Sequence, residues 1–511
     1  MSASSSSTAT PESVSSSLPS PFYMHQLPTE LWFAICDWIT SRRDIAALAR
    51  TCKYFVDVTG PALYSQISWA DHDYAASMAA LKGRPELFRN VHSLFLRDFA
   101  FSPSWDWPPL ADMDPHILTD IMRRPRYEEV APDLRDVVQL IPRFTHLKVL
   151  SFRRVQLPAT LYEDLALLPA LTTLNLRACN LMTVIPRNNA NLHLRTLRLD
   201  NLRWILSSDA SRDAMCSLAC TAELEYLEVD AHVAPMTFNL MMSTSALRGR
   251  PLVLHTLRTE ARTDEAGDFV SIAGFLAQTP SIEVLHLRRV PKTVSVPAAA
   301  LPNLRVLSGP AHCIEALVDN RPVHHVHILD QLPATRQHHN ALISLLGTQQ
   351  QLNAAYQSAA DPQAPATSYS EIVQVMEKVA RTGPPLRRLD FRMSTWDSEV
   401  LYMLAAKFPN LLDLRINCTH EGPHEDFMVE FASKFMTDFP RLEVLHIFGD
   451  NTRSCSRPDV LKETRAHLGL WERHNPYLRE VAVSSDVVWR KYGERDWGMT
   501  EPCSRAGFGY K

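Results

Sequence analysis

The stretch that decides the fold runs from His146 to Asp200 and reads "HLKVLSFRRVQLPATLYEDLALLPALTTLNLRACNLMTVIPRNNANLHLRTLRLD". It contains the pattern L-x-x-L-x-L, or a near copy of it, at Leu147, Leu171 and Leu194. Successive side chains of a strand point to opposite faces, so each copy predicts a short strand that buries its leucines and exposes the residues between them. The intervening sequence, such as "LYEDLALLPA", has helical periodicity. The stretch therefore predicts repeated strand–helix units.

The same pattern continues through most of the 511-residue chain. From Leu147 to Leu304, and again from Leu386 to Leu478, successive copies start 22 to 36 residues apart. Val91 and Val323 begin weaker copies. Stacked units of this length cover one another's apolar edges. The predicted fold class is α/β, a curved leucine-rich-repeat solenoid with divergent repeats, and an irregular α/β globule is the alternative. The further copies start at Leu224, Leu254, Ile282, Leu304, Leu386, Leu411, Leu442 and Leu478.

The domain organisation follows from where this pattern begins, stops and is interrupted. We expect the solenoid to cover residues 88–498, with inserts near 101–135 and 349–370 that lack the repeat. Residues 1–22 are rich in serine and contain no apolar run of the kind found in secretion signals, so they are interpreted as a disordered tail. Residues 499–511 form a C-terminal tail.

A separate helical pattern occupies residues 23–70, ahead of the repeats. A second helix is expected to open at Asp44, and a third short helix is expected to stop at Gly60-Pro61. Three short helices form only a marginal domain on their own, so such a module usually needs a partner surface. The first helix carries one apolar stripe, formed by Leu31, Ile35 and Ile39.

The order of landmarks in this module resembles that of the F-box family. These landmarks are Leu27-Pro28, Glu30-Leu31, Ile35, Ile39, Asp44-Ile45, Leu48-Ala49, Thr51-Cys52, Phe55 and Leu63-Tyr64. The resemblance implies docking on a Skp-type adaptor and, through it, on a cullin–RING ubiquitin ligase. An ordinary three-helix cap on a larger domain is the alternative. By the resemblance, the adaptor-binding residues are Leu27, Pro28, Leu31, Ile35, Ile39, Leu48 and Phe55.

The residues between the buried positions of each repeat are expected to line the concave face. Their charges fall into a basic, an acidic and a second basic zone along the chain. Complementary charge registers a partner more than it adds affinity, so we expect a protein segment with acidic ends and a basic middle. The predicted substrate-binding residues are Arg153, Arg177, Arg198, Glu228, Asp230, Glu260, Arg288, Arg392 and Arg415.

Composition and motifs favour binding over chemistry. A formal charge of -4 offers no electrostatic case for nucleic acid or a membrane, and no apolar run approaches the length of about 18 residues that spans a bilayer. The nine cysteines are scattered, which suits a reducing compartment, cytoplasm or nucleus. Neither a nucleophile elbow nor a phosphate-binding glycine loop is present, so we expect no catalytic site and no cofactor. His324, His325 and His327 lack the spacing of a zinc site, so no metal is expected.

The sequence therefore predicts a non-catalytic, substrate-recruiting subunit of a cullin–RING ubiquitin ligase. Two alternatives stay open: a scaffold that binds the adaptor without leading to ubiquitylation, and a receptor whose concave face needs a small ligand to complete it. The substrate itself is not identified.

Overall fold

The computed structural model describes residues 27–39, 41–70, 74–99, 132–157, 161–181, 192–204, 215–221, 223–249, 252–261, 266–288, 290, 295–329, 368–382, 385–419, 422–423, 435–449, 458–483, 487–493 and 496–500. The predicted tail over residues 1–22 lies outside this part of the chain. So do most of the C-terminal tail and most of both predicted inserts.

One long sheet runs through the described part of the chain, and its 16 strands follow one another in space in the order of the sequence. Strands β1 to β17 are parallel, whereas β18 and β19 are antiparallel and close the C-terminal end. The strands are β1 (Gln66–Ala70), β2 (Ser93–Arg97), β3 (Val149–Arg153), β5 (Thr173–Arg177), β7 (Thr196–Asp200), β9 (Tyr226–Val229), β10 (Thr256–Glu260), β11 (Val284–Arg288), β12 (Val306–Gly309), β13 (His325–Ile328), β14 (Arg388–Met393), β15 (Asp413–Cys418), β16 (Val444–Gly449), β17 (Glu480–Ala482), β18 (Val488–Lys491) and β19 (Trp497–Thr500).

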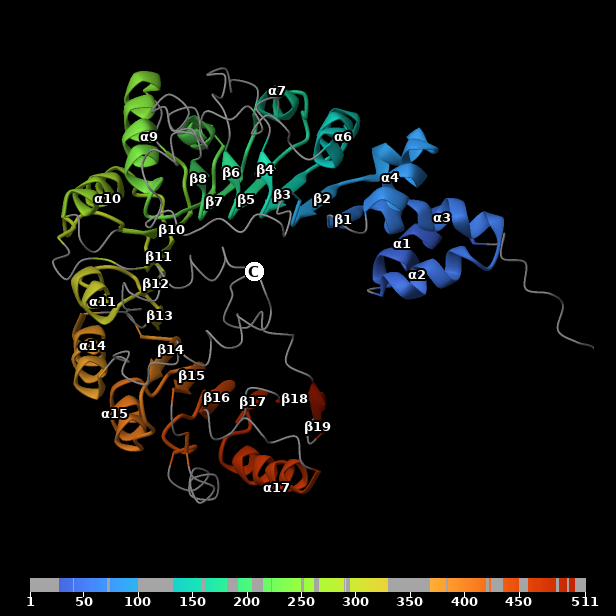
Figure 1. The fold of residues 1–511 in the computed structure, drawn as a ribbon. Helices are drawn as coiled ribbons and strands as arrows, with labels where there is room; N and C mark the ends of the chain where they lie inside the picture. The colour runs from blue at the N-terminus through green and yellow to red at the C-terminus, as the bar shows by residue number, and fades with distance from the viewer. Residues whose placement is uncertain are drawn as a thin grey trace, which may run out of the picture.

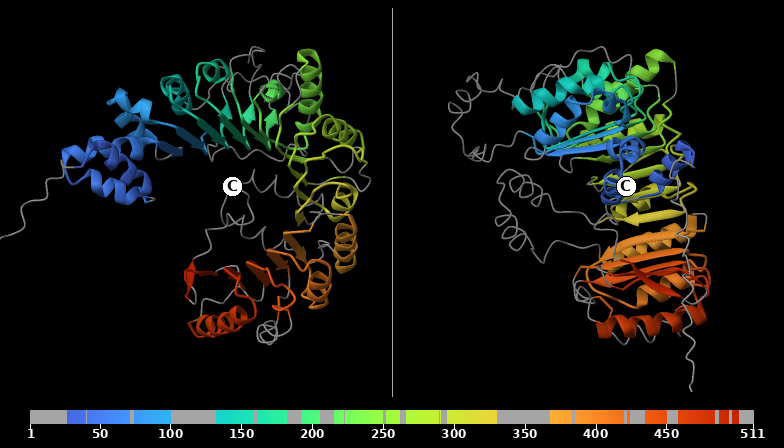
Figure 2. Two further views of the ribbon diagram at one scale, coloured as in Figure 1. Left: turned by 180° about the vertical axis from the view of Figure 1, so that it is seen from behind. Right: turned by 90° about the vertical axis from the view of Figure 1, so that its right-hand side faces the viewer.

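The sheet bends into an arc whose inner side is formed by the strands and whose outer side is covered by helices (Figures 1 and 2). A second sheet of three short strands, β4 (Gln156–Leu157), β6 (Asn180–Leu181) and β8 (Arg203–Trp204), follows β3, β5 and β7. The connecting helices are α4 (Tyr74–Lys82), η2 (Pro85–Asn90), α6 (Pro132–Leu140), η5 (Ile141–Arg143), α7 (Leu161–Ala166), η6 (Ser217–Cys220), α9 (Ala234–Arg248), α10 (Ala266–Gln278), α11 (Ala311–Leu317), α14 (Tyr369–Thr382), α15 (Glu399–Lys407) and α17 (Pro458–His474).

The core of the arc is built by the repeated leucines, as the sequence predicts. In β5, Leu174 and Leu176 are buried while Thr173 and Asn175 are half-buried and Arg177 is exposed. Other repeats show the same alternation, and their buried side chains form one continuous apolar cluster from Ile67 to Trp497. The weaker copies at Val91 and Val323 likewise form strands β2 and β13. The predicted mixed α/β fold with a long curved repeat sheet is therefore confirmed.

Four strands each end in the same kind of backbone turn, and these turns keep neighbouring repeats aligned. Asp98, Arg154, Ala178 and Asn201 follow β2, β3, β5 and β7 with left-handed φ values of 52° to 59°. The backbone N–H of Arg154 donates to the carbonyl of Arg177 at 3.0 Å, and those of Asp98 and Ala178 bond to the next strand in the same way. Left-handed backbone costs a non-glycine residue about 1–2 kcal/mol, so it persists because these turns bond the next repeat.

The N-terminal helices form a module with a small core of its own. They are α1 (Thr29–Trp38), α2 (Arg42–Ala49) and α3 (Lys53–Tyr64), and they lie at the end of the arc beyond β1 (Figure 1). Cys36, Phe55 and Val58 make up this core, separate from that of the sheet. The ring of Trp32 meets that of Phe55 edge-on, with centroids 4.8 Å apart.

Two details of this module differ from expectation. The second helix begins at Arg42 rather than Asp44, because Ser41 is the N-cap and its hydroxyl accepts the backbone N–H of Asp44. The third helix does not stop at Gly60-Pro61 but continues through it to Tyr64. Glycine has no Cβ to clash with the ring of a following proline, so helical backbone is permitted at that position.

Candidate functional site

The candidate site is the concave face of the sheet, formed by strand residues that alternate with the buried leucines. Register places one residue of each strand from β1 to β16 of the long sheet in a single row across the arc. Polar and charged side chains predominate in this row, which consists of Ser68, Phe95, Ser151, Asn175, Arg198, Glu228, Arg258, His286, Ser308, His327, Asp390, Arg415 and His446.

The structure brings five of the predicted substrate-binding residues together around one hollow of about 510 Å³ on this face. Gln66, Ser68 and Phe95 line its N-terminal end. Arg392 and Arg415 lie farther along the arc, on β14 and β15, and are not part of this hollow. The five residues that line it are Arg153, Arg177, Arg198, Glu228 and Arg288.

Glu228 is the centre of a cluster in which two arginines neutralise its charge. Arg198 and Arg258, on the two flanking strands, place guanidinium nitrogens 3.5 Å and 3.6 Å from its carboxylate. The hydroxyl of Tyr226 donates to the same carboxylate at 2.8 Å, and the Arg198 guanidinium lies over the Tyr226 ring at 4.9 Å. Burial and the neighbouring carboxylate raise the pKa of Tyr226 to about 12, so this phenol stays protonated as a donor.

The predicted acidic zone is therefore not a free acidic surface. Glu260 pairs with Arg288 at 3.6 Å, so its charge is neutralised in the same manner as that of Glu228. Asp230 is a correction: only 7% of it is exposed, and it accepts the backbone N–H groups of Leu202, His232 and Val233. It holds the turn between β9 and α9, which indicates a structural role, although it also lines a smaller hollow together with Glu228 and Glu260.

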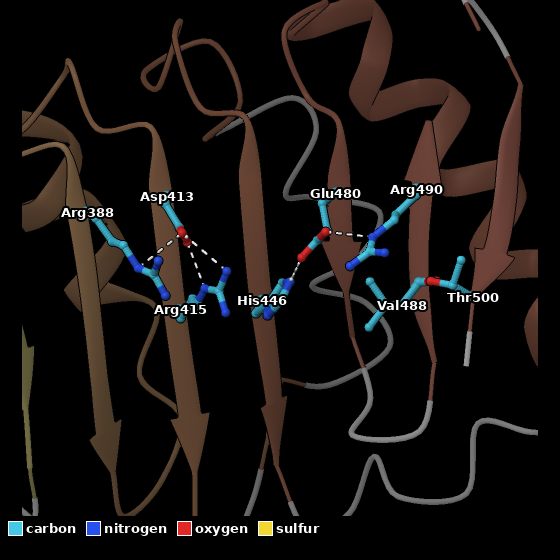
Figure 3. Close-up of polar contacts among 8 residues, drawn as sticks. All are labelled: Arg388, Asp413, Arg415, His446, Glu480, Val488, Arg490 and Thr500. Carbon is cyan, nitrogen blue, oxygen red and sulfur yellow. Dashed lines mark hydrogen bonds and ion pairs between the residues drawn. The ribbon is translucent and has the colours of Figure 1, made fainter. Parts of the chain in front are cut away.

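The C-terminal part of the face contains two further ion-pair groups (Figure 3). Asp413 lies between Arg388 at 3.2 Å and Arg415 at 2.9 Å, so the predicted contact Arg415 is already paired. Glu480 lies between His446 at 2.9 Å and Arg490 at 2.8 Å. These contacts join β14 to β15 and β16 to β17 and β18, which indicates a role in holding the strands together.

The contribution of Glu480 to the stability of this end of the sheet should depend on pH. The hydrogen bond from His446, followed by that from Arg490, lowers the pKa of Glu480 from its ordinary 4.5 to about 2. A carboxyl whose pKa is lowered by folding stabilises fully above pH 4.5 and loses that contribution as the pH falls towards 2. We expect Glu480→Gln to remove on the order of 1 kcal/mol at neutral pH and less at pH 3, as measured by urea unfolding. An equal loss at both pH values would contradict this assignment.

Ser308, His327 and Asp390 lie on three adjacent strands in an order that suggests a hydrolytic triad. Ser308 Oγ is 3.3 Å from His327 Nδ1, but His327 Nε2 is 3.8 Å from Asp390, beyond hydrogen-bond distance. Ser308 is also almost fully buried, at 1% exposed. Burial raises the pKa of Asp390 to about 6. We interpret these residues as a packed polar strip within the sheet.

The seven predicted adaptor contacts are not equally accessible. Pro28, Leu31 and Ile35 are exposed, whereas Leu27, Ile39 and Leu48 are half-buried. Phe55 is a correction: it is 1% exposed, because it fills the centre of the module and cannot contact a partner. Three exposed apolar side chains of the module were missed by the periodicity argument, namely Phe33, Trp38 and Val56.

Arg97 is a further residue that sequence reasoning missed on the concave face. It ends β2 and lies in register with Arg153, which is itself in register with Arg177. The weak repeat that begins at Val91 was the available signal, because its fourth and sixth positions, Leu94 and Leu96, are buried and Arg97 follows them.

Neither a metal cluster nor a membrane-spanning helix occurs in the described part of the chain. No group of three or more His, Cys, Asp or Glu side chains is arranged to hold a metal ion among the residues with described positions. In the same part of the chain, no helix has both the length and the apolar character needed to cross a bilayer.

Comparisons with known proteins assign this chain to no family. No protein-family model matches the sequence, and the search of curated proteins finds no match either. Among solved structures, the chain is similar to an internalin, InlF, of Listeria monocytogenes. The two share 13% identity over 67% of this chain and 68% of the internalin chain, with a TM-score of 0.26. A likeness at this level says nothing about what the chain binds.

Proposed function

We propose that the chain is a substrate-recruiting subunit of a cullin–RING ubiquitin ligase. Its N-terminal module would bind a Skp-type adaptor, and its concave face would bind a protein substrate. The resemblance of the module to the F-box family suggests the adaptor, and the charged concave face supports a protein partner. Such a receptor needs no catalytic residues, because holding a substrate close to the charged ubiquitin carrier accelerates transfer by proximity.

The observation that carries this proposal is the exposed apolar surface of the module. Five of its large apolar side chains are 38% to 85% exposed, although the module contains fewer than 40 residues, and Trp38 is the most exposed of them. Small modules rarely leave so much apolar surface open to water unless a partner covers it. Leu31, Ile35 and Trp38 are spaced as i, i+4 and i+7, which places them on one face of α1, here called the α1 surface. Phe33 and Val56 are exposed elsewhere on the module.

Co-purification tests the proposal in two stages. The full chain co-expressed with a Skp-type adaptor should elute with it as a stable 1:1 complex, and adding the cullin should extend that complex. Affinity purification from cells with the proteasome blocked should then enrich a ubiquitylated third protein, as a receptor requires and a scaffold does not. A chain that elutes alone, apart from a folded adaptor, would refute the proposal.

A further inference from the structure

Three arginines form an uninterrupted row at the N-terminal end of the concave face. Arg97, Arg153 and Arg177 occupy the same register position on β2, β3 and β5. All three are exposed, and all three line the hollow of about 510 Å³. Neighbouring strands are about 4.8 Å apart, and like charges placed directly opposite one another destabilise a sheet. The row, here called the arginine ladder, is therefore unfavourable in the isolated chain.

Within the described residues, an ion pair forms at only one end of the arginine ladder. Arg177 Nε is 3.0 Å from the carboxylate of Asp200, the next residue in register. Arg97 and Arg153 have no ion-pair or side-chain hydrogen-bond partner among the residues that the structure describes. Partial burial, followed by repulsion from Arg177 and Arg154, lowers the pKa of Arg153, against the attraction of Asp98. In the described part of the chain, two adjacent arginines are thus open to an external anion.

The extent of the hollow indicates what kind of molecule carries that anion. Ser151 and Asn175, two positions earlier on β3 and β5, line the same hollow. Its lining runs from Gln66 on β1 to Arg288 on β11, across strands about 4.8 Å apart. A single phosphate ion covers only a small part of that length, whereas an extended protein segment can follow it.

We propose that the arginine ladder binds an extended acidic segment of a partner protein, with carboxylates on Arg97 and Arg153. The pair between Arg177 and Asp200 shows that a carboxylate fits this row. Alternate side chains of an extended segment are about 6.6 Å apart, whereas Arg97 and Arg153 start from strands about 4.8 Å apart. Arginine side chains are long and flexible, so two exposed guanidinium groups can spread to meet carboxylates at alternate positions.

This proposal specifies the charge pattern expected of the bound substrate segment. Its biological meaning rests on the proposed recruiting function. A segment with two acidic ends and a basic middle, as the sequence suggested, does not fit, because the acidic zone of the concave face is already paired with Arg198, Arg258 and Arg288. One acidic stretch is enough to complement the charges that remain.

Fluorescence anisotropy with a labelled peptide tests the site on the full chain. The probe alternates alanine and glutamate, and its partner probe has glutamine in place of glutamate. We expect the glutamate probe to bind at least about tenfold more tightly in low salt, and the replacements Arg97→Gln with Arg153→Gln to remove that difference. Arg387→Gln with Arg441→Gln removes two exposed charges elsewhere and should leave binding unchanged. Equal binding of both probes, or retention by the Arg97/Arg153 variant, would overturn the proposal.

Two further readouts distinguish a peptide site from a purely structural row of arginines and from a small-anion site. Arg97→Gln with Arg153→Gln should raise the melting temperature by about 1–2 °C, because repulsion is relieved; a fall would show a structural role and refute the proposal. Millimolar inorganic phosphate should not displace the glutamate probe beyond the effect of ionic strength, and full displacement would identify a small-anion site instead. Adaptor binding should be unaffected, so failure here is distinguishable from failure of the proposed receptor function.

Discussion

Replacing Leu31 and Trp38 together by alanine is expected to weaken adaptor binding by about 100-fold or more. Both side chains belong to the α1 surface, where Trp38 is 85% and Leu31 is 49% exposed. Central apolar and tryptophan contacts typically cost about 2 kcal/mol or more each when truncated, and about 1.4 kcal/mol corresponds to a tenfold change. Neither side chain belongs to a described core cluster, so the fold should survive. Isothermal titration with purified adaptor measures the loss.

A matched control tests whether the loss of affinity comes from lost adaptor contacts or from removing exposed apolar side chains anywhere on the chain. Leu167 and Val270 are also large, apolar and exposed, at 61% and 71%, but they lie in the repeat region. Their double replacement by alanine should leave adaptor affinity unchanged. If both double variants bind the adaptor like the unmodified chain, the α1 surface is not its docking site and the proposed function loses its main support.

Phe55→Ala is expected to unfold the N-terminal module while the sheet stays intact. Removing a fully buried phenylalanine typically costs about 3–5 kcal/mol, and this module has only two other buried side chains in its described core cluster, Cys36 and Val58. Its separate core means that the loss is not shared with the repeats. Amide hydrogen exchange should speed up across α1 and α3 by a factor of about 100 or more, with strands β3 to β16 unchanged, and adaptor binding should disappear.

Phe275→Ala is the corresponding change in the body of the sheet. Phe275 stacks on Phe238 with centroids 4.4 Å apart, between α9 and α10. Faster exchange is then expected around β9 to β11, with the module still protected and the adaptor still bound. Slow exchange in α1 and α3 of the Phe55 variant would show that this module does not depend on its own core.

The strands were predictable from sequence because their pattern repeats with the geometry of the sheet. In β5 or β7, an apolar residue at every second position leaves only one way to bury the strand on its outer side. The pairing of the exposed charges was harder to predict, since Arg198 and Glu228 are far apart in the chain and meet only through register. Asp230 was assigned to the surface because it follows a strand, although three backbone N–H groups turn it inward.

The helical module was predictable in outline but not in its orientation. Periodicity identified the stripe of Leu31 and Ile35, yet a stripe does not say which face meets the neighbouring helices. Cys36 and Phe55 pack inward instead, and the stripe remains open. A core of three residues leaves no strong signal in a sequence of this length. The F-box assignment and its partners therefore stay predictions that the adaptor experiments decide.

The order of the strands has a consequence for how the chain is made. Each strand of the long sheet pairs with the strand before it. Every new repeat can therefore add to the edge of the sheet already formed, during translation. At about 5–20 residues per second, a repeat is added every few seconds, from β1 onwards. The antiparallel pair of β18 and β19 follows all the parallel strands in the chain. A chain cut short before that hairpin would end on a bare parallel edge, whose unpaired N–H and C=O groups can pair with another chain and cause aggregation.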